Sequence, residues 1–245
     1  LDAIIEKAKK DDLVIIYFSG HGDVEGKKLT QPGFLLCWDA PSRVYMGGGT
    51  YSLSFLQEVV STLSIQNQAK VVVITDACHA GKLAGSQIGG AQLTTSNLAK
   101  QYANEVKIMS CQADEFSLEG KAWGGGRGVF SYYLLAGIQG LADRNNDEIV
   151  TLAEIERYLG GKVPAAAAPH SQIPMTVGNK NSPISRVNPE VLAKLQKTDL
   201  ESGFSTTGQK SMDSGISGLT DSALIRKVAA FNKALAAGRL VEPKN

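Results

Sequence analysis

Short apolar runs alternate with amphipathic segments along most of the chain. The runs 13–18 (LVIIYF) and 71–75 (VVVIT) have the length and the β-branched composition of buried strands. Between them, apolar residues recur over 52–63 at the spacing of one helical face. A strand, a crossover helix and a second strand in this order form a parallel βαβ unit.

The same two periodicities predict the other elements. They are a helix over 1–8, a hairpin strand over 34–37, a strand over 105–109, helices over 129–141 and 152–159, and a last strand over 172–177. Strands that alternate with helices are typical of the α/β class. We therefore expect a mostly parallel central sheet flanked by helices.

The pattern changes towards the C-terminus. Residues 198–220 are rich in Ser, Gly and Thr, as linkers are. Apolar residues then return at helical spacing over 223–235. The sequence predicts an α/β domain over 1–187, a linker over 188–220 and a C-terminal helical segment over 221–245.

Composition and charge exclude several classes of protein. The 245 residues include 43% hydrophobic positions, which is an ordinary globular content, and 25 Lys and Arg against 24 Asp and Glu. This balance, without a basic cluster, predicts no nucleic-acid partner and no anionic membrane partner. The longest apolar run, 13–18, is far shorter than the roughly 18 residues of a membrane-spanning helix. Three scattered cysteines favour a reducing, cytoplasmic location.

A histidine and a cysteine follow the two predicted central strands. His21 comes three residues after the run 13–18, and Cys78 comes three residues after the run 71–75. Loops at the carboxyl ends of parallel strands open into a crevice, and neighbouring strands lie about 4.8 Å apart, so the two side chains can meet there. An imidazole raises the reactivity of a nearby thiol and can protonate a leaving amine. The pair predicts a nucleophile, Cys78, and an acid–base residue, His21.

The alternative is that Cys78 is a small buried residue and His21 a hydrogen-bonded loop residue. Their surroundings argue against it, because both follow apolar strands and both are flanked by glycine and small residues. Gly22 lets a substrate approach the backbone. Its N–H and that of Cys78 are candidate donors of an oxyanion hole.

The segments 18–22 (FSGHG) and 76–81 (DACHAG) resemble the caspase-type cysteine peptidases, most closely metacaspases and bacterial caspase homologues. Asp76 stands where the caspase signature has Gln, which favours the metacaspase branch. The resemblance covers residues 1–184 and implies a caspase-like fold. Because that fold begins with a further strand and helix, we expect this chain to lack them, and an N-terminal fragment of the same protein is a candidate partner.

The resemblance also implies a specificity pocket. Asp76 lies two residues before Cys78, so strand alternation places its carboxylate on the same side, where it suits a cation. In metacaspase-like enzymes this Asp and the Ser two residues before the histidine, here Ser19, line the pocket for Arg or Lys. Asp114 and Glu115 could add negative charge. Alternatively, Asp76 caps a helix or turn, and Asp114 is a solvated loop residue.

Residues 143–154 have the spacing of a calcium-binding EF-hand loop, although Glu148 replaces the glycine of its sharp turn. The candidate ligands are Asp143, Asn145, Asp147, Ile149 through its carbonyl, Thr151 and Glu154. The alternative is an ordinary helix–helix loop in which Asp147 or Thr151 caps the second helix. The sequence leaves calcium binding and helix capping equally open.

Together these features predict a cysteine endopeptidase that cleaves proteins or peptides after Arg or Lys and needs no cofactor for the chemistry. Lys82, Lys100 and Lys210 lie in the long loop and the linker, where self-cleavage is expected. Two alternatives stay open: a catalytically silent caspase-like interaction scaffold, and a related separase-like or legumain-like protease.

Overall fold

The structure of the chain is a computed structural model, which divides into two compact units, Leu1–Phe204 and Ser205–Asn245. The described residues are 1–25, 32–41, 44–77, 103–112 and 115–202. They all belong to the first unit. The predicted C-terminal segment, 221–245, therefore lies outside the described residues.

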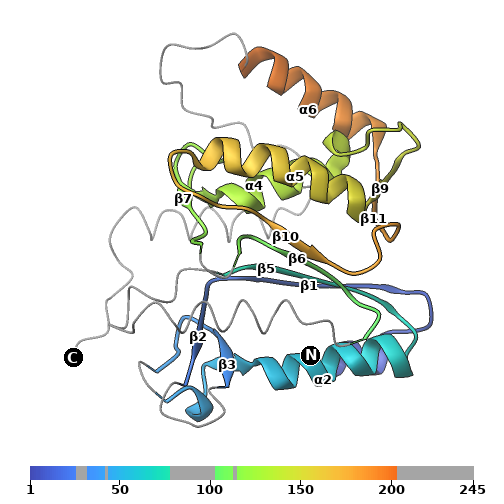
Figure 1. Ribbon diagram of the computed structural model, residues 1–245. Coiled ribbons are helices and arrows are strands. Elements are labelled where there is room, and N and C mark those ends of the chain that lie inside the picture. Colours follow the sequence, from blue (N-terminus) through green and yellow to red (C-terminus); the bar gives the residue numbers. More distant parts are fainter. Residues whose placement is uncertain (26–31, 42–43, 78–102, 113–114, 203–245) are drawn as a thin grey trace, which may run out of the picture. The chain divides into compact units, whose positions relative to one another are not determined.

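A four-stranded sheet forms the centre of the first unit, with the strand order β1-β5-β6-β10 (Figure 1). Its strands are β1 (Leu13–Ser19), β5 (Lys70–Asp76), β6 (Val106–Met109) and β10 (Met175–Val177). The first three are parallel and β10 is antiparallel to β6. The expected mostly parallel central sheet is confirmed.

β1 and β5 pair without a register shift from end to end. Ser19 and Asp76 are direct partners at the carboxyl ends of the two strands. The hydrogen bonding between the two segments continues one residue beyond β1, where the Gly20 N–H donates to the Asp76 carbonyl at 3.0 Å. The last residues of β1 and β5, Ser19 and Asp76, therefore lie side by side at this edge of the sheet.

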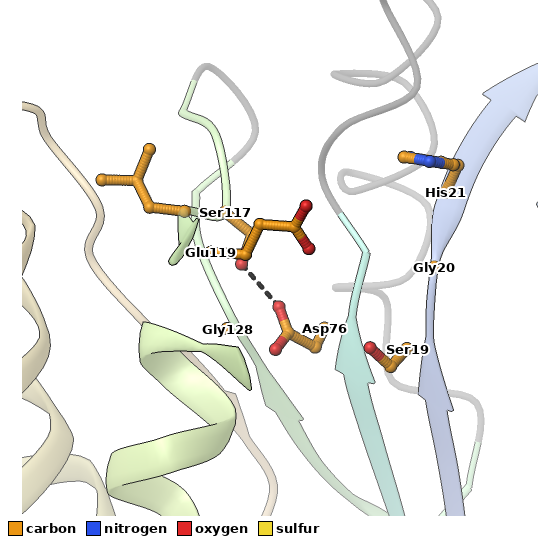
Figure 2. A pocket seen from close by; sticks show the side chains of 8 residues that line it. Ser19, Gly20, His21, Asp76, Ser117, Glu119 and Gly128 are labelled. Carbon is orange, nitrogen blue, oxygen red and sulfur yellow. Dashed lines mark hydrogen bonds between the residues drawn. The ribbon is translucent and has the colours of Figure 1, made fainter. Parts of the chain in front are cut away.

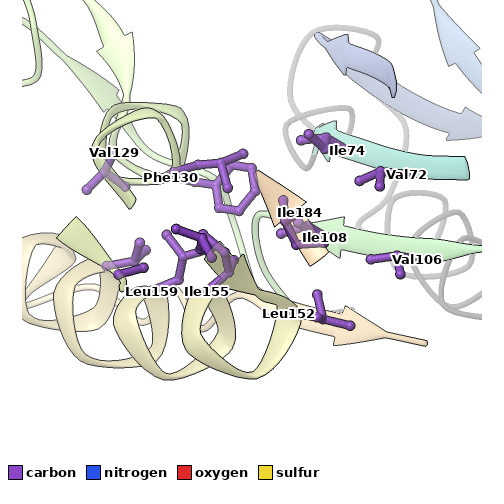
Figure 3. Close-up of a cluster of buried hydrophobic side chains, with 14 of the residues drawn as sticks. Val72, Ile74, Val106, Ile108, Val129, Phe130, Leu152, Ile155, Leu159 and Ile184 are labelled. Carbon is purple, nitrogen blue, oxygen red and sulfur yellow. The ribbon is translucent and has the colours of Figure 1, made fainter. Parts of the chain in front are cut away.

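Helices cover both faces of the sheet (Figure 1). They are α1 (Asp2–Lys7) and α2 (Leu53–Ser61) on one face, and α4 (Val129–Ala136) and α5 (Leu152–Ala167) on the other. Neighbouring residues of β5 point to opposite faces. Val72 and Ile74 pack in the cluster with α4 and α5 (Figure 3), and Val71 and Val73 pack in the cluster with α2. Both faces are thus apolar, as in other parallel sheets.

Shorter elements extend from this core. The remaining strands are β2 (His21–Val24), β3 (Gly33–Leu36), β4 (Thr50–Ser52), β7 (Glu119–Gly120), β8 (Arg127–Gly128), β9 (Ile149–Thr151) and β11 (Pro183–Arg186). The remaining helical turns are η1 (Tyr45–Gly47), η2 (Thr62–Gln66), η3 (Gly137–Leu141) and the helix α6 (Pro189–Ser202). β2, β3 and β4 form an antiparallel sheet, β7 pairs with β8, and β9 pairs with β11.

Several segments differ from the sequence-based expectation, among them the strand expected to be the last, β10, which β11 follows in the chain. The helix α5 continues to Ala167, beyond the predicted end at residue 159. It contains Gly160, Gly161 and Pro164, which disfavour helix, but the burial of Val163 and Ala167 stabilises its last turns. The helix α6 occupies the first part of the expected linker, where Leu192 packs against the core. His21 begins a strand instead of lying in a loop, because it pairs with Leu36 of β3.

Candidate active site

A cavity of about 140 Å³ lies at the carboxyl ends of β1 and β5. Its walls come from three places in the chain: the turn from β1 into β2, the last residue of β5, and the segment that forms the hairpin of β7 and β8 (Figure 2). Such an edge is where α/β proteins place their ligand sites. The cavity is therefore the candidate active site.

The turn from β1 into β2 contributes Ser19, Gly20 and His21. The His21 side chain is half-buried and belongs to the first residue of β2. Figure 2 shows Ser19 and Asp76 on neighbouring strands and His21 further along the chain that carries Ser19. Gly22 follows within β2 and is buried. Ser19 and His21 thus line one cavity with Asp76.

Asp76 forms the polar wall of the cavity, and its side chain is only 8% exposed. Ser117 Oγ donates to Asp76 Oδ1 at 2.5 Å, and Ser131 Oγ donates to Asp76 Oδ2 at 2.5 Å. Both donors are side-chain hydroxyls, and among the described residues they give each oxygen of the buried carboxylate a neutral partner. The alternative role as a cap would use N–H groups of the residues that follow, which from Cys78 on lie outside the described residues.

Gly128 packs directly against this carboxylate. A Cβ atom at this position would overlap Asp76 Oδ2. The residue pairs with Glu119 across the short ladder of β7 and β8 and is also the N-cap of α4. A side chain at residue 128 would displace Asp76, so glycine is required here for the shape of the cavity.

Besides Gly128, four residues that shape the site were not predicted from the sequence. Glu119 lines the cavity and has an exposed side chain, and Ser117 and Ser131 hold Asp76. Gln172 is fully buried, and its Oε1 accepts from Leu118 N–H at 2.8 Å. No periodicity or spacing marks any of them, because they approach Asp76 only through tertiary structure.

The charge of the site is negative. Among the described residues that line the cavity, Asp76 and Glu119 are acidic and none is Lys or Arg. Figure 2 shows the Glu119 side chain between Ser117 and the strand that carries His21. Such acidic lining attracts a positively charged ligand group.

Two candidate residues lie outside the described residues. They are Cys78, which follows β5 by two positions, and Asp114, which precedes Glu115. Their predicted roles, as nucleophile and as an additional negative charge, stay predictions. Glu115 itself accepts from Ser171 Oγ at 2.5 Å and from Ile173 N–H at 2.6 Å, so it fastens its own loop to the segment before β10.

The loop 143–154 shows the helix cap that the sequence left open. Thr151 is the N-cap of α5, and it forms a reciprocal capping box with Glu154. Burial acts to raise the pKa of Glu154, but hydrogen bonds from Thr151 and from Arg144 N–H outweigh it and hold the pKa below its ordinary value.

The side-chain oxygens of Asp143, Asn145 and Asp147 accept hydrogen bonds from within the loop, mostly from its backbone N–H groups and in one case from Asn145 Nδ2 to Asp147 Oδ2. Asp143 accepts from Asn146 and Glu148, Asn145 accepts from Asp147, and Asp147 accepts from Ile149. Glu148 adopts φ 63°, so the sharp turn forms without glycine. Within the described part of the chain, no group of three or more His, Cys, Asp or Glu side chains is placed to hold a metal ion.

Helices long and apolar enough to cross a membrane are also not found in the described ranges.

Comparison with known proteins gives one family. Residues 1–182 match the sequence model of the caspase domain. The chain also resembles a crystal structure of a protein from Geobacter sulfurreducens, at 16% sequence identity and a TM-score of 0.42, with 78% of this chain and 74% of that chain covered. No curated protein sequence matches significantly.

Calcium binding by the loop 143–154 stays a prediction, which a calorimetric titration of the whole chain with Ca²⁺ tests. Binding would raise the melting temperature, because only the folded loop presents its oxygens together. Asp143→Asn with Asp147→Asn keeps the size of both side chains but removes two charges and one acceptor oxygen from each, so it should weaken binding at least about tenfold. The prediction is wrong if no heat appears at millimolar Ca²⁺, or if the double variant binds equally well.

Proposed function

Because the chain belongs to the caspase-domain family, we propose that it is a cysteine endopeptidase with Cys78 as nucleophile and His21 as general base and acid. Its substrates are proteins or peptides with Arg or Lys before the scissile bond. Gly22 and Cys78 supply the backbone N–H groups that stabilise the oxyanion. Ser19 and Asp76 belong to the pocket for the basic side chain.

The observation that carries this proposal is the register of β1 and β5. Ser19 and Asp76 are direct partners. His21 and Cys78 each follow one of these partners by two residues. Neighbouring strands are about 4.8 Å apart, so chain segments that leave such a pair together can bring an imidazole to a thiol. The same register supports a pocket wall at Asp76 next to the reacting groups.

The proposed reaction is acyl transfer in two steps. His21 takes the proton of the Cys78 thiol, and the sulfur adds to the carbonyl carbon of the substrate. The tetrahedral oxyanion accepts hydrogen bonds from the N–H groups of Gly22 and Cys78, and His21 then protonates the leaving amine. A water molecule, deprotonated by His21, hydrolyses the thioester and releases the new carboxylate and the free thiol.

The charge of the cavity supports basic specificity. A guanidinium or ammonium group that enters the cavity loses hydration, and a charge-assisted hydrogen bond of roughly 1.5–3 kcal/mol offsets that loss. Asp76 is placed to make such a bond, and Glu119 adds a second negative charge. An acidic substrate side chain would meet both carboxylates and no cation among the described lining residues.

Two alternative functions can each be distinguished from the proposed one by a single property. A catalytically silent caspase-like scaffold would bind peptides without turnover. A separase-like or legumain-like protease would differ in the residue that it accepts before the cut. Fluorogenic peptides with Arg, Lys, Asp and Asn at that position, measured side by side, separate all three.

The first test concerns the two catalytic residues. Cys78→Ala and His21→Ala should each lower kcat/KM for an Arg peptide by at least about a thousandfold, because each removes a partner in covalent catalysis. Circular dichroism and melting temperature check that the fold is kept. Cys37→Ala is the matched control, because Cys37 is a free, half-buried thiol that does not line the cavity. Near-native turnover by Cys78→Ala would exclude the proposed nucleophile.

The second test concerns the charge of Asp76. Asp76→Asn keeps the shape of the side chain, so kcat/KM for Arg and Lys peptides should fall about tenfold to a hundredfold, without a comparable gain for Asp peptides. Alkylation of Cys78 by iodoacetamide should change much less, because this reagent carries no basic group. If Asp76→Asn cleaves Arg peptides as fast as the parent protein, Asp76 does not carry the specificity.

A third test concerns self-processing. A protease with basic specificity should cut its own exposed lysines, and Lys82, Lys100 and Lys210 are the candidates. Mass spectrometry of purified active protein should show fragments that end at these residues, and the Cys78→Ala protein should stay intact. The same fragments in both preparations would assign the cleavage to another protease.

A further inference from the structure

Two chains of hydrogen-bond donors converge on Asp76. In the first, Ser131 Oγ lies 2.8 Å from Tyr17 Oη and donates to Asp76 Oδ2 at 2.5 Å. A serine hydroxyl has one hydrogen. Since Ser131 gives that hydrogen to the carboxylate, the hydrogen between the two hydroxyls must come from Tyr17. The direction of the first chain is therefore Tyr17 to Ser131 to Asp76.

In the second chain of donors, a serine hydroxyl again accepts one hydrogen bond and donates another to Asp76. Gln172 Nε2 donates to Ser117 Oγ at 3.2 Å, and Ser117 Oγ donates to Asp76 Oδ1 at 2.5 Å. The other Nε2 hydrogen goes to the carbonyl of Ser110 at 3.0 Å. Gln172 is fully buried, so its amide is a fixed anchor for the Ser117 hydroxyl. The direction of the second chain is Gln172 to Ser117 to Asp76.

The two hydroxyls reach the carboxylate from separate elements. Ser131 is in α4, and Ser117 is in the segment between β6 and β7. Each oxygen of a carboxylate can accept about two hydrogen bonds. Each serine uses one acceptor site of one oxygen, so each oxygen has the capacity for one further hydrogen bond from a ligand.

We propose that Ser117 and Ser131 are positioning residues that fix the Asp76 carboxylate for recognition of the substrate cation. This inference rests on the proposed function and adds to it the residues that set the strength of charge recognition. Without either hydroxyl, one oxygen of Asp76 would lose its donor and the carboxylate would rotate or recruit water. A cation would then meet a mobile and hydrated charge in place of an ordered one.

The test compares two peptides that differ only in charge before the scissile bond: arginine and its neutral analogue citrulline. The ratio of their kcat/KM values reports charge recognition, because a general loss of structure lowers both values alike. Ser131→Ala and Ser117→Ala should each lower this ratio about tenfold. Ser131→Thr keeps the hydroxyl and should retain the ratio.

A matched control and a double variant make the test specific. Ser185→Ala also removes a part-buried serine donor, here to the Ile138 carbonyl at 2.6 Å, but away from the cavity, so the ratio should not change. In the Asp76→Asn background, Ser131→Ala should lower the ratio no further, because Ser131 acts through Asp76. An unchanged ratio in both single Ala variants would overturn the inference while leaving the proposed function intact.

Failure of the proposed function gives a different result. The parent protein would then hydrolyse neither peptide, or both equally. A double-mutant cycle of urea unfolding with Ser131→Ala and Asp76→Asn needs no activity and still decides the contact. Additive effects on stability would overturn the positioning role, and a clear coupling would support it for any cation that binds in the cavity.

Discussion

The in-register parallel pairing of β1 and β5 is the constraint on which the candidate site depends. It brings Ser19 opposite Asp76, and in the sequence these two residues precede His21 and Cys78 by two positions each. Side chains alternate along a strand, so a slip by one residue would turn Asp76 away from the cavity. The slip is opposed by packing, because alternate residues of β5 are buried in two different apolar clusters. The apolar core therefore sets the geometry of the polar site.

The elements that can be predicted well from the sequence are those in which apolar residues form a continuous run or recur at regular spacing. The continuous runs of β1 and β5 and the apolar stripe of α2 leave little choice of structure, and the caspase-like motifs add the family. The helix α5 was underestimated because Gly160, Gly161 and Pro164 are poor helix formers, whereas buried side chains beyond them extend the helix. Tertiary packing outweighs local propensity there.

Only the part of the site that lies next to a motif was predictable. Asp76 and Ser19 flank the candidate cysteine and histidine and were identified as pocket residues. Ser117, Ser131 and Gln172 have no such neighbours, and a lone hydroxyl or amide in a sequence indicates nothing by itself. Their roles follow from the packing of β6, α4 and the segment before β10 around one carboxylate. These contacts are set by the assembled core.

The two described donors to Asp76 are neutral hydroxyls, unlike the partner of the other buried carboxylate at the central sheet. Burying a carboxylate is costly unless it is paired or hydrogen-bonded. Glu105, the residue before β6, is buried beside Lys107 of β6 at 3.4 Å, so that the two opposite charges compensate each other. Asp76 is buried with hydroxyl donors, which supply hydrogen bonds but no positive charge. An ion pair like that of Glu105 and Lys107 would add a positive charge beside Asp76, whereas the serine hydroxyls add none.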